Sequence, residues 1–305
     1  MTPDWPAIAA AHRQPTARRP WALNGVPVGS VAEADVQALQ ACAPELQVHP
    51  EGLALALPHD RVDTVLARIN AALRARGLIH AWRDETFPLF GPPAGAGTAQ
   101  PVLARIERAS ARFWGTLTLG AHCTGWVAGA DGRPAALWIA QRAFDKATDP
   151  GKFDNLVGGG VPLGQSPWQA LQREGWEEAG LPAAVMQRAT PGRVLRLHRD
   201  VEEGLQHEWN HSYDLQLQAH ERPHNQDGEV AGFELLPVVQ AVALAAGEQM
   251  TVDAALVTLD FVLRHRLLPE DECRRLEARC TALWVPEAPN EALGGPAAAT
   301  DARRR

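Results

Sequence analysis

Apolar positions in the first part of the chain follow helical and strand periods in turn. Ser30 and Glu33 have the spacing of a capping box, so the pattern predicts a helix over residues 30–43. The apolar run GLALALP at 52–58 predicts a strand, and Asp60 then has the character of an N-cap for a helix with one apolar face. The chain is therefore predicted to begin with a small α+β unit.

A change in composition marks the later part of this unit. Residues 91–101 are rich in Gly, Pro and Ala, which predicts a loop or a joint between domains. After it, residues 103–114 are predicted to form a helix that buries its apolar side chains. We therefore place an N-terminal α+β accessory domain at residues 1–114.

From residue 115 onward the pattern is that of strands followed by helices. Two apolar segments, 126–127 and 137–140, flank the turn GADG, and this arrangement predicts a β-hairpin. Further strands are predicted at 193–198 and 208–217, and helices at 251–265 and 269–283. A second domain is expected over 115–285, whereas residues 286–305 show no apolar period and are predicted to be a flexible tail.

Composition and charge bound the class of protein. The chain has 305 residues and a net charge of −7, and its 46% hydrophobic and 21% charged residues are typical of globular proteins. The acidic balance argues against a nucleic-acid binder, for which a basic stripe is expected. It does not exclude a phosphate-bearing ligand, because a local site can have the opposite sign. The chain has only two lysines, Lys146 and Lys152.

The sequence shows no feature that predicts export or a membrane span. Its first residues lack a basic segment followed by an apolar one, so no signal peptide is expected. The longest nearly apolar stretch, 235–246, has about a dozen residues, whereas a span needs about 20. The four cysteines have neither CxxC nor zinc spacing, which favours reduced thiols. We expect a cytoplasmic protein that binds no membrane.

A glycine-rich segment at 158–160 leads into the helix that is most informative about chemistry. Ser166 and Gln169 form a second capping box, Pro167 suits the first helical position, and Gly180 suits the position after the helix end. Glycines ahead of a helix allow the backbone to come close to a ligand. The segment therefore predicts a helix that begins beside a binding site.

Three carboxylates project from one face of this predicted helix. Glu174, Glu177 and Glu178 stand at i, i+3 and i+4, so they are neighbours on the helix surface and repel one another. Oxygen ligands at this density suit hard cations such as Mg²⁺ or Mn²⁺. The alternative is a solvated acidic face, which for three glutamates alone is the more frequent arrangement.

The complete spacing resembles the Nudix box, G-x5-E-x7-R-E-U-x-E-E-x-G-U, in which U is apolar. The matching residues are Gly159, Arg173, Glu174, Glu177, Glu178, Gly180 and Leu181. Gln165 replaces the first glutamate, and we expect it to contact Arg173 more weakly while still accepting a hydrogen bond. Gly175 replaces an apolar residue at a cost of roughly 1 kcal/mol in a helix, and it is expected to permit close packing beneath. The resemblance implies a Nudix α/β/α sandwich with a mixed β-sheet.

Other segments are similar to one subgroup of the Nudix family. This is the thiamine-pyrophosphokinase-related subgroup, which carries an extra N-terminal domain. The similar segments lie at 108–113, 119–122, 137–142, 146–155, 227–230 and 259–261. Its fungal and plant members hydrolyse thiamine diphosphate analogues, above all oxo- and oxythiamine diphosphate, to monophosphates. The alternatives are a hydrolase of nucleoside diphosphate derivatives such as ADP-ribose or NADH, and a weakly catalytic diphosphate-binding sensor.

The family resemblance implies roles for the residues of the box. Glu177 and Glu178 are expected to bind Mg²⁺ or Mn²⁺, and Glu174 is either a further metal ligand or the base that deprotonates the attacking water. Gly159 is expected to offer its backbone carbonyl to the metal. Arg173 is expected to fix a glutamate by a charge-assisted pair rather than to contact substrate.

Residues outside the helix complete the predicted site. Glu229 is a candidate fourth carboxylate, and the alternative is a turn residue in Asp-Gly-Glu. At least one of Arg142, Lys146 and Lys152 is expected to contact the diphosphate, against the alternative of a solvated loop. The predicted substrate-binding residues are Arg142, Lys146, Lys152, Gly159 and Gly160. The expected partner is a small-molecule diphosphate, and a homodimer is an expected assembly because Nudix enzymes often dimerise.

One motif in the sequence points to a different chemistry. Residues 207–211 read His-Glu-Trp-Asn-His and match H-E-x-x-H, which binds zinc when it lies on a helix. Here the apolar residues alternate with mainly polar ones, which predicts a strand. Residues four apart on a strand are about 13 Å apart, which does not suit two imidazoles that share one zinc ion. We therefore expect no zinc protease site.

Overall fold

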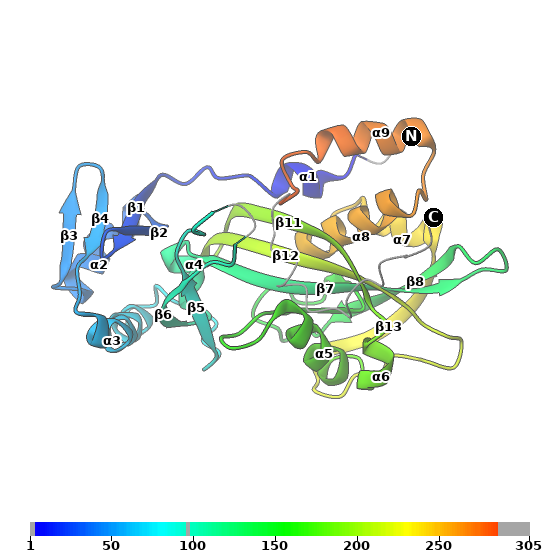
Figure 1. Cartoon of the computed structure of the whole chain (residues 1–305), viewed down its shortest axis with the longest axis horizontal. Helices are drawn as coiled ribbons and strands as arrows, with labels where there is room; N and C mark the ends of the chain where they lie inside the picture. Colours follow the sequence, from blue (N-terminus) through cyan, green and yellow to red (C-terminus); the bar gives the residue numbers. More distant parts are fainter. Residues whose placement is uncertain (1–3, 96–97, 286–305) are drawn as a thin grey trace, which may run out of the picture.

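A four-stranded sheet forms the N-terminal part of the computed structural model, which describes residues 4–95 and 98–285 (Figure 1). Its strand order is β2-β1-β4-β3, and only the β1–β4 pair is parallel. The strands are β1 Arg18–Leu23, β2 Val26–Ala32, β3 Leu46–His49 and β4 Gly52–Leu55, and the helices are α2 Val36–Cys42 and α3 Val62–Ala75. The predicted α+β character of this region is confirmed.

Two predicted helix starts in this region are wrong. Ser30 lies inside β2, where its hydroxyl accepts a hydrogen bond from Arg18 Nε at 3.0 Å, so pairing with β1 takes precedence over the local capping pattern. A 3₁₀ turn at Glu33–Asp35 comes next and α2 follows it. Asp60 lies in another 3₁₀ turn, and α3 begins at Val62 without a side-chain cap.

The predicted helix over 103–114 is also wrong. The chain instead forms strand β6 (Val102–Glu107), which pairs with β5 (Thr86–Phe90), and then the short helix α4 (Ser110–Trp114). Buried Ala104 and Ile106 alternate with the more exposed Leu103, Arg105 and Glu107, which is a strand period. The predicted loop at 91–101 therefore joins β5 to β6 inside this region rather than two domains, and its residues 96–97 lie outside the described part.

A buried polar chain fixes α4 against α3. Trp21 Nε1 donates to the carbonyl of Trp114 at 2.9 Å, and Trp114 Nε1 donates to Asn70 Oδ1 at 2.7 Å. Asn70 in turn donates to Ser110 Oγ at 3.1 Å. Buried polar groups are stable when every partner is satisfied in this way. The chain therefore enters the second sheet from a rigid point.

A mixed seven-stranded sheet forms the second region. The main order is β11-β12-β7-β8-β13, with β10 paired to β7 and β9 paired to β8. Only β12 and β7 are parallel, so the sheet is mixed as predicted. The strands are β7 Leu117–Ala128, β8 Pro134–Arg142, β9 Phe153–Asp154, β10 Val157–Gly160, β11 Thr190–Val201, β12 Gly204–Gln216 and β13 Val230–Pro237. The predicted hairpin is formed by β7 and β8.

Helices cover both faces of this sheet (Figure 1). On one face lie α5 (Pro167–Glu177) and α6 (Ala183–Met186), and on the other lie α7 (Val238–Ala245), α8 (Val252–Arg264) and α9 (Glu270–Arg279). The predicted α/β/α sandwich after an N-terminal α+β region is confirmed. The predicted tail at 286–305 lies outside the described residues.

The first helix of the chain belongs to the second region in space. Helix α1 (Pro6–Ala10) packs with α8 and shares its hydrophobic core, although the predicted boundary groups residues 1–114 together. The segment after it runs along the edge of β11, where the amide of His198 donates to the carbonyl of Ala11 at 2.8 Å. The chain then crosses to the N-terminal sheet (Figure 1).

The cysteines and the apolar helices bear on two further features of the sequence. All four cysteines are buried and free. In the portion of the chain that the structure describes, no helix combines the length and the apolar character that crossing a membrane requires.

Helix α8 is held to β12 by a buried ionic network. Arg264 donates to both carboxylate oxygens of Asp214 at 2.6 Å and to Asp260 at 2.8 Å, and Ser212 Oγ donates to Asp260 at 2.7 Å. Burial acts to raise the pKa of Asp214, but hydrogen bonds from Arg264 and His265 outweigh it, so the pKa lies below its ordinary value. The stabilisation is therefore complete at neutral pH, and it is lost as the pH falls through the lowered pKa.

We predict that Arg264→Met lowers the free energy of unfolding by about 3 kcal/mol, because two buried carboxylates lose their shared cation. Urea unfolding followed by tryptophan fluorescence measures the change. Arg274→Met is the matched control, since it removes an exposed pair on α9 and is expected to change stability by less than about 1 kcal/mol. Equal effects of the two substitutions would contradict a stabilising network.

Candidate active site

The glycine-rich strand β10 lies antiparallel to β7 and provides the floor of the site. Gly158, Gly159 and Gly160 pair with His122, Ala121 and Gly120. Because these glycines carry no Cβ, side chains from other elements pack directly against the backbone of the strand. The side chains that occupy the space of the missing Cβ atoms are His122 at Gly158, Glu174 at Gly159, Phe87 and Arg108 at Gly160, and Glu208 at Gly120.

Helix α5 begins next to this strand and has the ends that the sequence predicts. Ser166 Oγ accepts from the amide of Gln169 at 3.2 Å, and the Gln169 side chain accepts from the amide of Ser166 at 2.9 Å. Gly180 has a φ of 61° just beyond the helix, which a glycine adopts without strain. A Cβ at Gly175 would lie 2.5 Å from the sulfur of Met186, so this glycine permits the expected close packing.

Arg173 links two carboxylates of α5, the half-exposed Glu177 and the largely buried Glu174. Its Nη1 donates to Glu177 at 2.6 Å and its Nη2 donates to Glu174 at 2.8 Å. Its Nε donates to Gln165 Oε1 at 3.3 Å, a longer contact of the kind expected from the replaced glutamate. Arg173 therefore holds two of the three carboxylates and bridges the helix to the loop before it.

Glu178 is the buried carboxylate of the group. Its side chain accepts a hydrogen bond from the amide of Gly158 at 3.1 Å, and only 6% of the residue is exposed. Burial, followed by the neighbouring charge of Glu174, raises the pKa of Glu178 to about 8. Burial likewise raises the pKa of Glu174. These carboxyl groups therefore need cations close by in order to be ionised at neutral pH.

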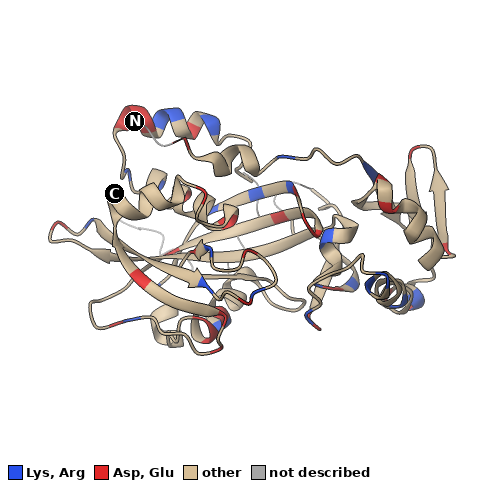
Figure 2. Cartoon of the chain, turned by 180° about the vertical axis from the view of Figure 1, so that it is seen from behind, with Lys and Arg blue, Asp and Glu red and all other residues tan. Residues whose placement is uncertain are grey.

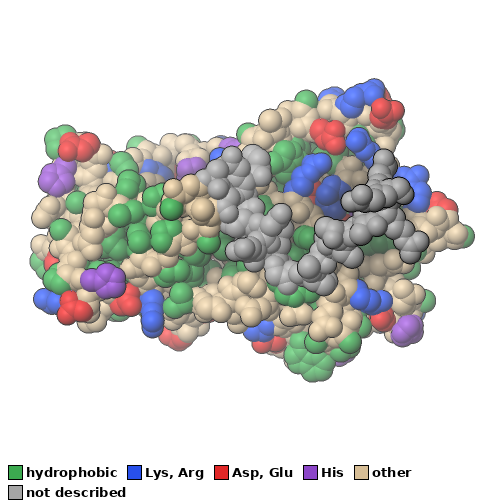
Figure 3. All heavy atoms as spheres, viewed as in Figure 1, with side chains coloured by type: hydrophobic (Ala, Val, Ile, Leu, Met, Phe, Trp, Pro, Cys, Tyr) green, Lys and Arg blue, Asp and Glu red, His purple; other side chains and the backbone are tan. Residues whose placement is uncertain are grey.

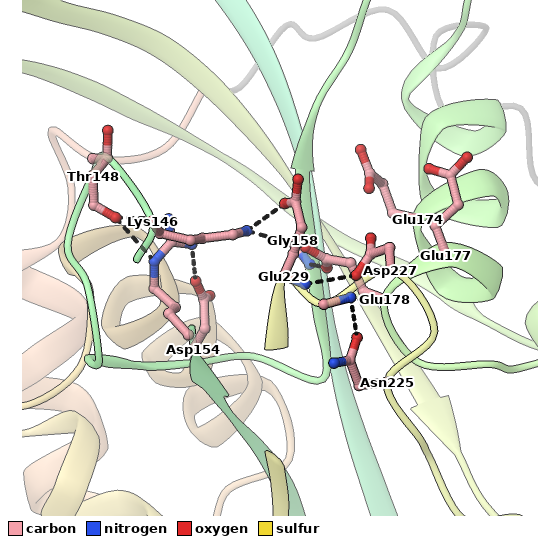
Figure 4. A network of polar contacts seen from close by, with 12 residues as sticks. Lys146, Thr148, Asp154, Gly158, Glu174, Glu177, Glu178, Asn225, Asp227 and Glu229 are labelled. Carbon is pink, nitrogen blue, oxygen red and sulfur yellow. Dashed lines mark hydrogen bonds and ion pairs between the residues drawn. The ribbon is translucent and has the colours of Figure 1, made fainter. Parts of the chain in front are cut away.

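Lys146 reaches from the loop after β8 to two carboxylates (Figure 4). Its Nζ lies 2.5 Å from Glu229 and 3.7 Å from Glu178. Burial acts to raise the pKa of Glu229, but the hydrogen bond and charge of Lys146 outweigh it and lower the pKa. The structure therefore brings Glu229, which immediately precedes β13, close to the glutamates of α5.

The other two predicted cations have different surroundings. Arg142 donates to Asp154 at 3.0 Å and to the carbonyl of Thr148 at 2.9 Å, so it holds the loop that carries Lys146. Lys152 pairs with Asp149 at 2.8 Å, and 41% of its side chain is exposed. Lys146 is thus the cation of the three that lies against the glutamates.

The comparisons place this region in a known family. Residues 121–255 match the family model described as "NUDIX domain". The chain contains a Nudix domain. It is 37% identical over 215 residues to "Nudix hydrolase 20, chloroplastic" of Arabidopsis thaliana, a match that covers 70% of this chain and 55% of the relative. It is 35% identical over 213 residues to "Nudix hydrolase 24, chloroplastic" of the same plant, covering 69% and 56%.

The similarity to these relatives and to solved structures is partial. The chain spans slightly more than half the length of both plant proteins. Among solved structures, DR0079 from Deinococcus radiodurans is 21% identical with a TM-score of 0.43, over 58% of this chain and 99% of that protein. The family model covers residues 121–255, which make up most of the second region, and the N-terminal α+β region precedes it.

A cavity of about 920 Å³ lies over the floor of the Nudix domain. All the predicted site residues line it, and so do residues that the sequence analysis missed. The missed charged and aromatic residues that lie against the glycines are Phe87, Arg108, His122 and Glu208. Arg108 lies in a segment that was noted for its resemblance, and Glu208 belongs to a run of polar residues at alternate positions of β12.

Basic and acidic side chains are intermixed in both views that show charge (Figures 2 and 3). Blue and red segments are interspersed along the elements in Figure 2, and the face in Figure 3 shows scattered charged side chains. Around the cavity, acidic and basic side chains are mixed in the same way.

The H-E-x-x-H residues lie on strand β12, as the alternation predicts. His207 pairs with His198 of β11 across the strands, and His211 is buried with a pKa lowered to about 4 by burial. Across residues 4–95 and 98–285, no three His, Cys, Asp or Glu side chains are already arranged to hold a metal ion. Glu174 and Glu177 of the box are each paired with Arg173, at 2.8 and 2.6 Å.

We predict that Gly158→Ala destabilises the protein by about 2 kcal/mol, because the new Cβ would lie 2.7 Å from the rigid imidazole of His122. Urea unfolding measures the loss. Gly232→Ala on β13 is the matched control, because nothing lies within 4 Å of its new Cβ. A Gly158→Ala protein as stable as Gly232→Ala would show that the floor does not need this glycine.

Proposed function

We propose that the protein is a Mg²⁺- or Mn²⁺-dependent hydrolase that cleaves the diphosphate of a small molecule. The observation that carries the proposal is the buried Glu178, which lies beneath the glycine strand beside Glu174 and faces Lys146 in a 920 Å³ cavity. The Nudix domain and the names of the plant relatives support hydrolysis of a diphosphate bond.

The donor set fits a divalent cation. Three carboxylates at the end of α5 and Glu229 face two cations, Arg173 and Lys146. When all four carboxyl groups are ionised, the group has an excess of two negative charges. Carboxylate oxygens are the ligands that Mg²⁺ and Mn²⁺ prefer. Glu174, Glu177, Glu178 and the carbonyl of Gly159 would hold the ion.

Other residues of the site would position the carboxylates, bind the phosphate and take up a proton. A bound divalent cation lowers the pKa of water and neutralises phosphate charge. Arg173 holds Glu174 and Glu177 in place, and Lys146 offers a positive charge to the diphosphate from the opposite loop. Glu174 acts either as a ligand or as the base that takes the proton from the attacking water.

The proposed substrate is thiamine diphosphate or its oxidised analogues, converted to the monophosphate. This proposal rests on the similarity of several segments to the thiamine-pyrophosphokinase-related subgroup with its extra N-terminal domain. ADP-ribose or NADH hydrolysis and a weakly catalytic sensor are the other outcomes of its test. A cytoplasmic location and a homodimer stay predictions, and both plant relatives are named as chloroplastic.

A substrate panel tests the proposal. Oxythiamine diphosphate, thiamine diphosphate, ADP-ribose and deoxynucleoside triphosphates are incubated with Mg²⁺, and the monophosphate product is measured with and without EDTA. We expect the fastest turnover with oxythiamine diphosphate and none with EDTA. Faster turnover of ADP-ribose would reassign the substrate, and tight binding without turnover would favour the sensor.

We predict that Glu178→Gln abolishes the metal-dependent hydrolysis and leaves the melting temperature nearly unchanged. The amide has the same shape and can still accept the hydrogen bond from Gly158, but it carries no negative charge for a cation. Glu270→Gln, at an exposed position on α9, is the control and is expected to keep full activity. Unchanged turnover in Glu178→Gln would rule out this residue as a ligand.

A further inference from the structure

One wall of the Nudix cavity is made by the N-terminal region. The cavity lining extends from α5 and β10 to the segment before β5 and to the start of α4. Arg83, Glu85, Phe87 and Arg108 of this region all line it. The Nudix domain therefore shares its cavity with residues that come from outside its family pattern.

Arg108 is the charged side chain of this wall that reaches the floor, next to Phe87. Its guanidinium carbon lies 3.4 Å from the position that a Cβ of Gly160 would take. Its Nη1 donates to Glu85 at 2.8 Å, and the guanidinium lies 5.4 Å from the ring centre of Phe87. A carboxylate and an aromatic ring therefore hold one side of the fork.

The other side of the fork is open to the cavity. Among the described residues, Nε and Nη2 of Arg108 have no hydrogen-bond partner, and 40% of the side chain is exposed. A guanidinium with two free donors matches the spacing of phosphate oxygens. An arginine that served only to fix β5 would not need these donors to face a cavity.

Charges of the Nudix domain surround this position. The negative charges of Glu174 and Glu208 on the floor stabilise the positive charge of Arg108. The positive charges of Arg83 and Arg108 on the wall stabilise the ionised form of Glu229. Arg108 thus lies within electrostatic range of carboxylates of the proposed metal site. A ligand bound there by its phosphates would lie within reach of Arg108.

We propose that Arg108 binds a phosphate group of the diphosphate substrate, so that the N-terminal region completes the anion site of the Nudix domain. This inference rests on the proposed function. Glu85 is a positioning residue, because it holds Nη1 and leaves the remaining donors directed to the ligand. Arg83, exposed on the same wall, adds positive charge without a defined contact.

Steady-state kinetics of three variants test the proposal on the full chain. Arg108→Met removes the fork, Arg108→Lys keeps the charge without the fork, and Arg105→Met is the control. Arg105 lies on β6, pairs with Asp63 and has 66% of its side chain exposed. We expect Arg108→Met to raise KM by about tenfold to a hundredfold. The KM of Arg108→Lys should lie between that of the unmodified protein and that of Arg108→Met. The KM of Arg105→Met should equal that of the unmodified protein.

A binding measurement separates this inference from the proposed function. Methylene diphosphonate, which resists hydrolysis, is titrated calorimetrically in the presence of Mg²⁺. If the unmodified protein hydrolyses no member of the panel but binds this probe more tightly than Arg108→Met does, the function fails and the anion site stands. If Arg108→Met and Arg108→Lys keep the KM and the probe affinity of the unmodified protein, the inference fails whatever the activity. Glu85→Gln should weaken binding less than Arg108→Met does, and an equal or larger loss would indicate a structural role for the pair.

Discussion

The lack of side chains at the three glycines of β10 is the constraint on which the site depends. Three glycines there and Gly120 on β7 leave space that is filled by functional groups from three different parts of the chain. Glu174 comes from α5, Glu208 comes from β12, and Arg108 comes from the N-terminal region. A Cβ at Gly159 would meet Glu174, and one at Gly160 would meet Arg108. A Cβ at Gly120 would meet Glu208, so these glycines fix which charges can meet.

Charge balance explains why these groups form a site rather than an ordinary surface. Glu178 is buried beneath the strand, and its own hydrogen bond comes from the backbone amide of Gly158. Arg173 and Lys146 neutralise only part of the surrounding negative charge. The polar network that fastens α8 to β12 keeps the sheet rigid on the opposite face. The site therefore combines a fixed frame with carboxylates that can accept a cation.

Much of the Nudix domain could be predicted because its signals are local. The capping box at Ser166 and the spacing of the glutamates are read within one helix, and the structure has both as expected. In the N-terminal region the local signals conflict with tertiary pairing: Ser30 lies inside a sheet, and residues 102–107, most of them within the predicted helix, form a strand. Arg108 was missed for this reason, because a predicted helix gave no indication that the residue would follow a strand and face the cavity. Contacts between the two regions depend on packing that no motif encodes.

The most direct test of the account is the location of a divalent ion. Crystals of the protein soaked in Mn²⁺ would show the ion in an anomalous difference map. We predict a peak in contact with Glu178, between β10 and Glu174 and Glu177 of α5. No peak there at Mn²⁺ concentrations that saturate activity, or a single peak elsewhere in the molecule, would contradict the account.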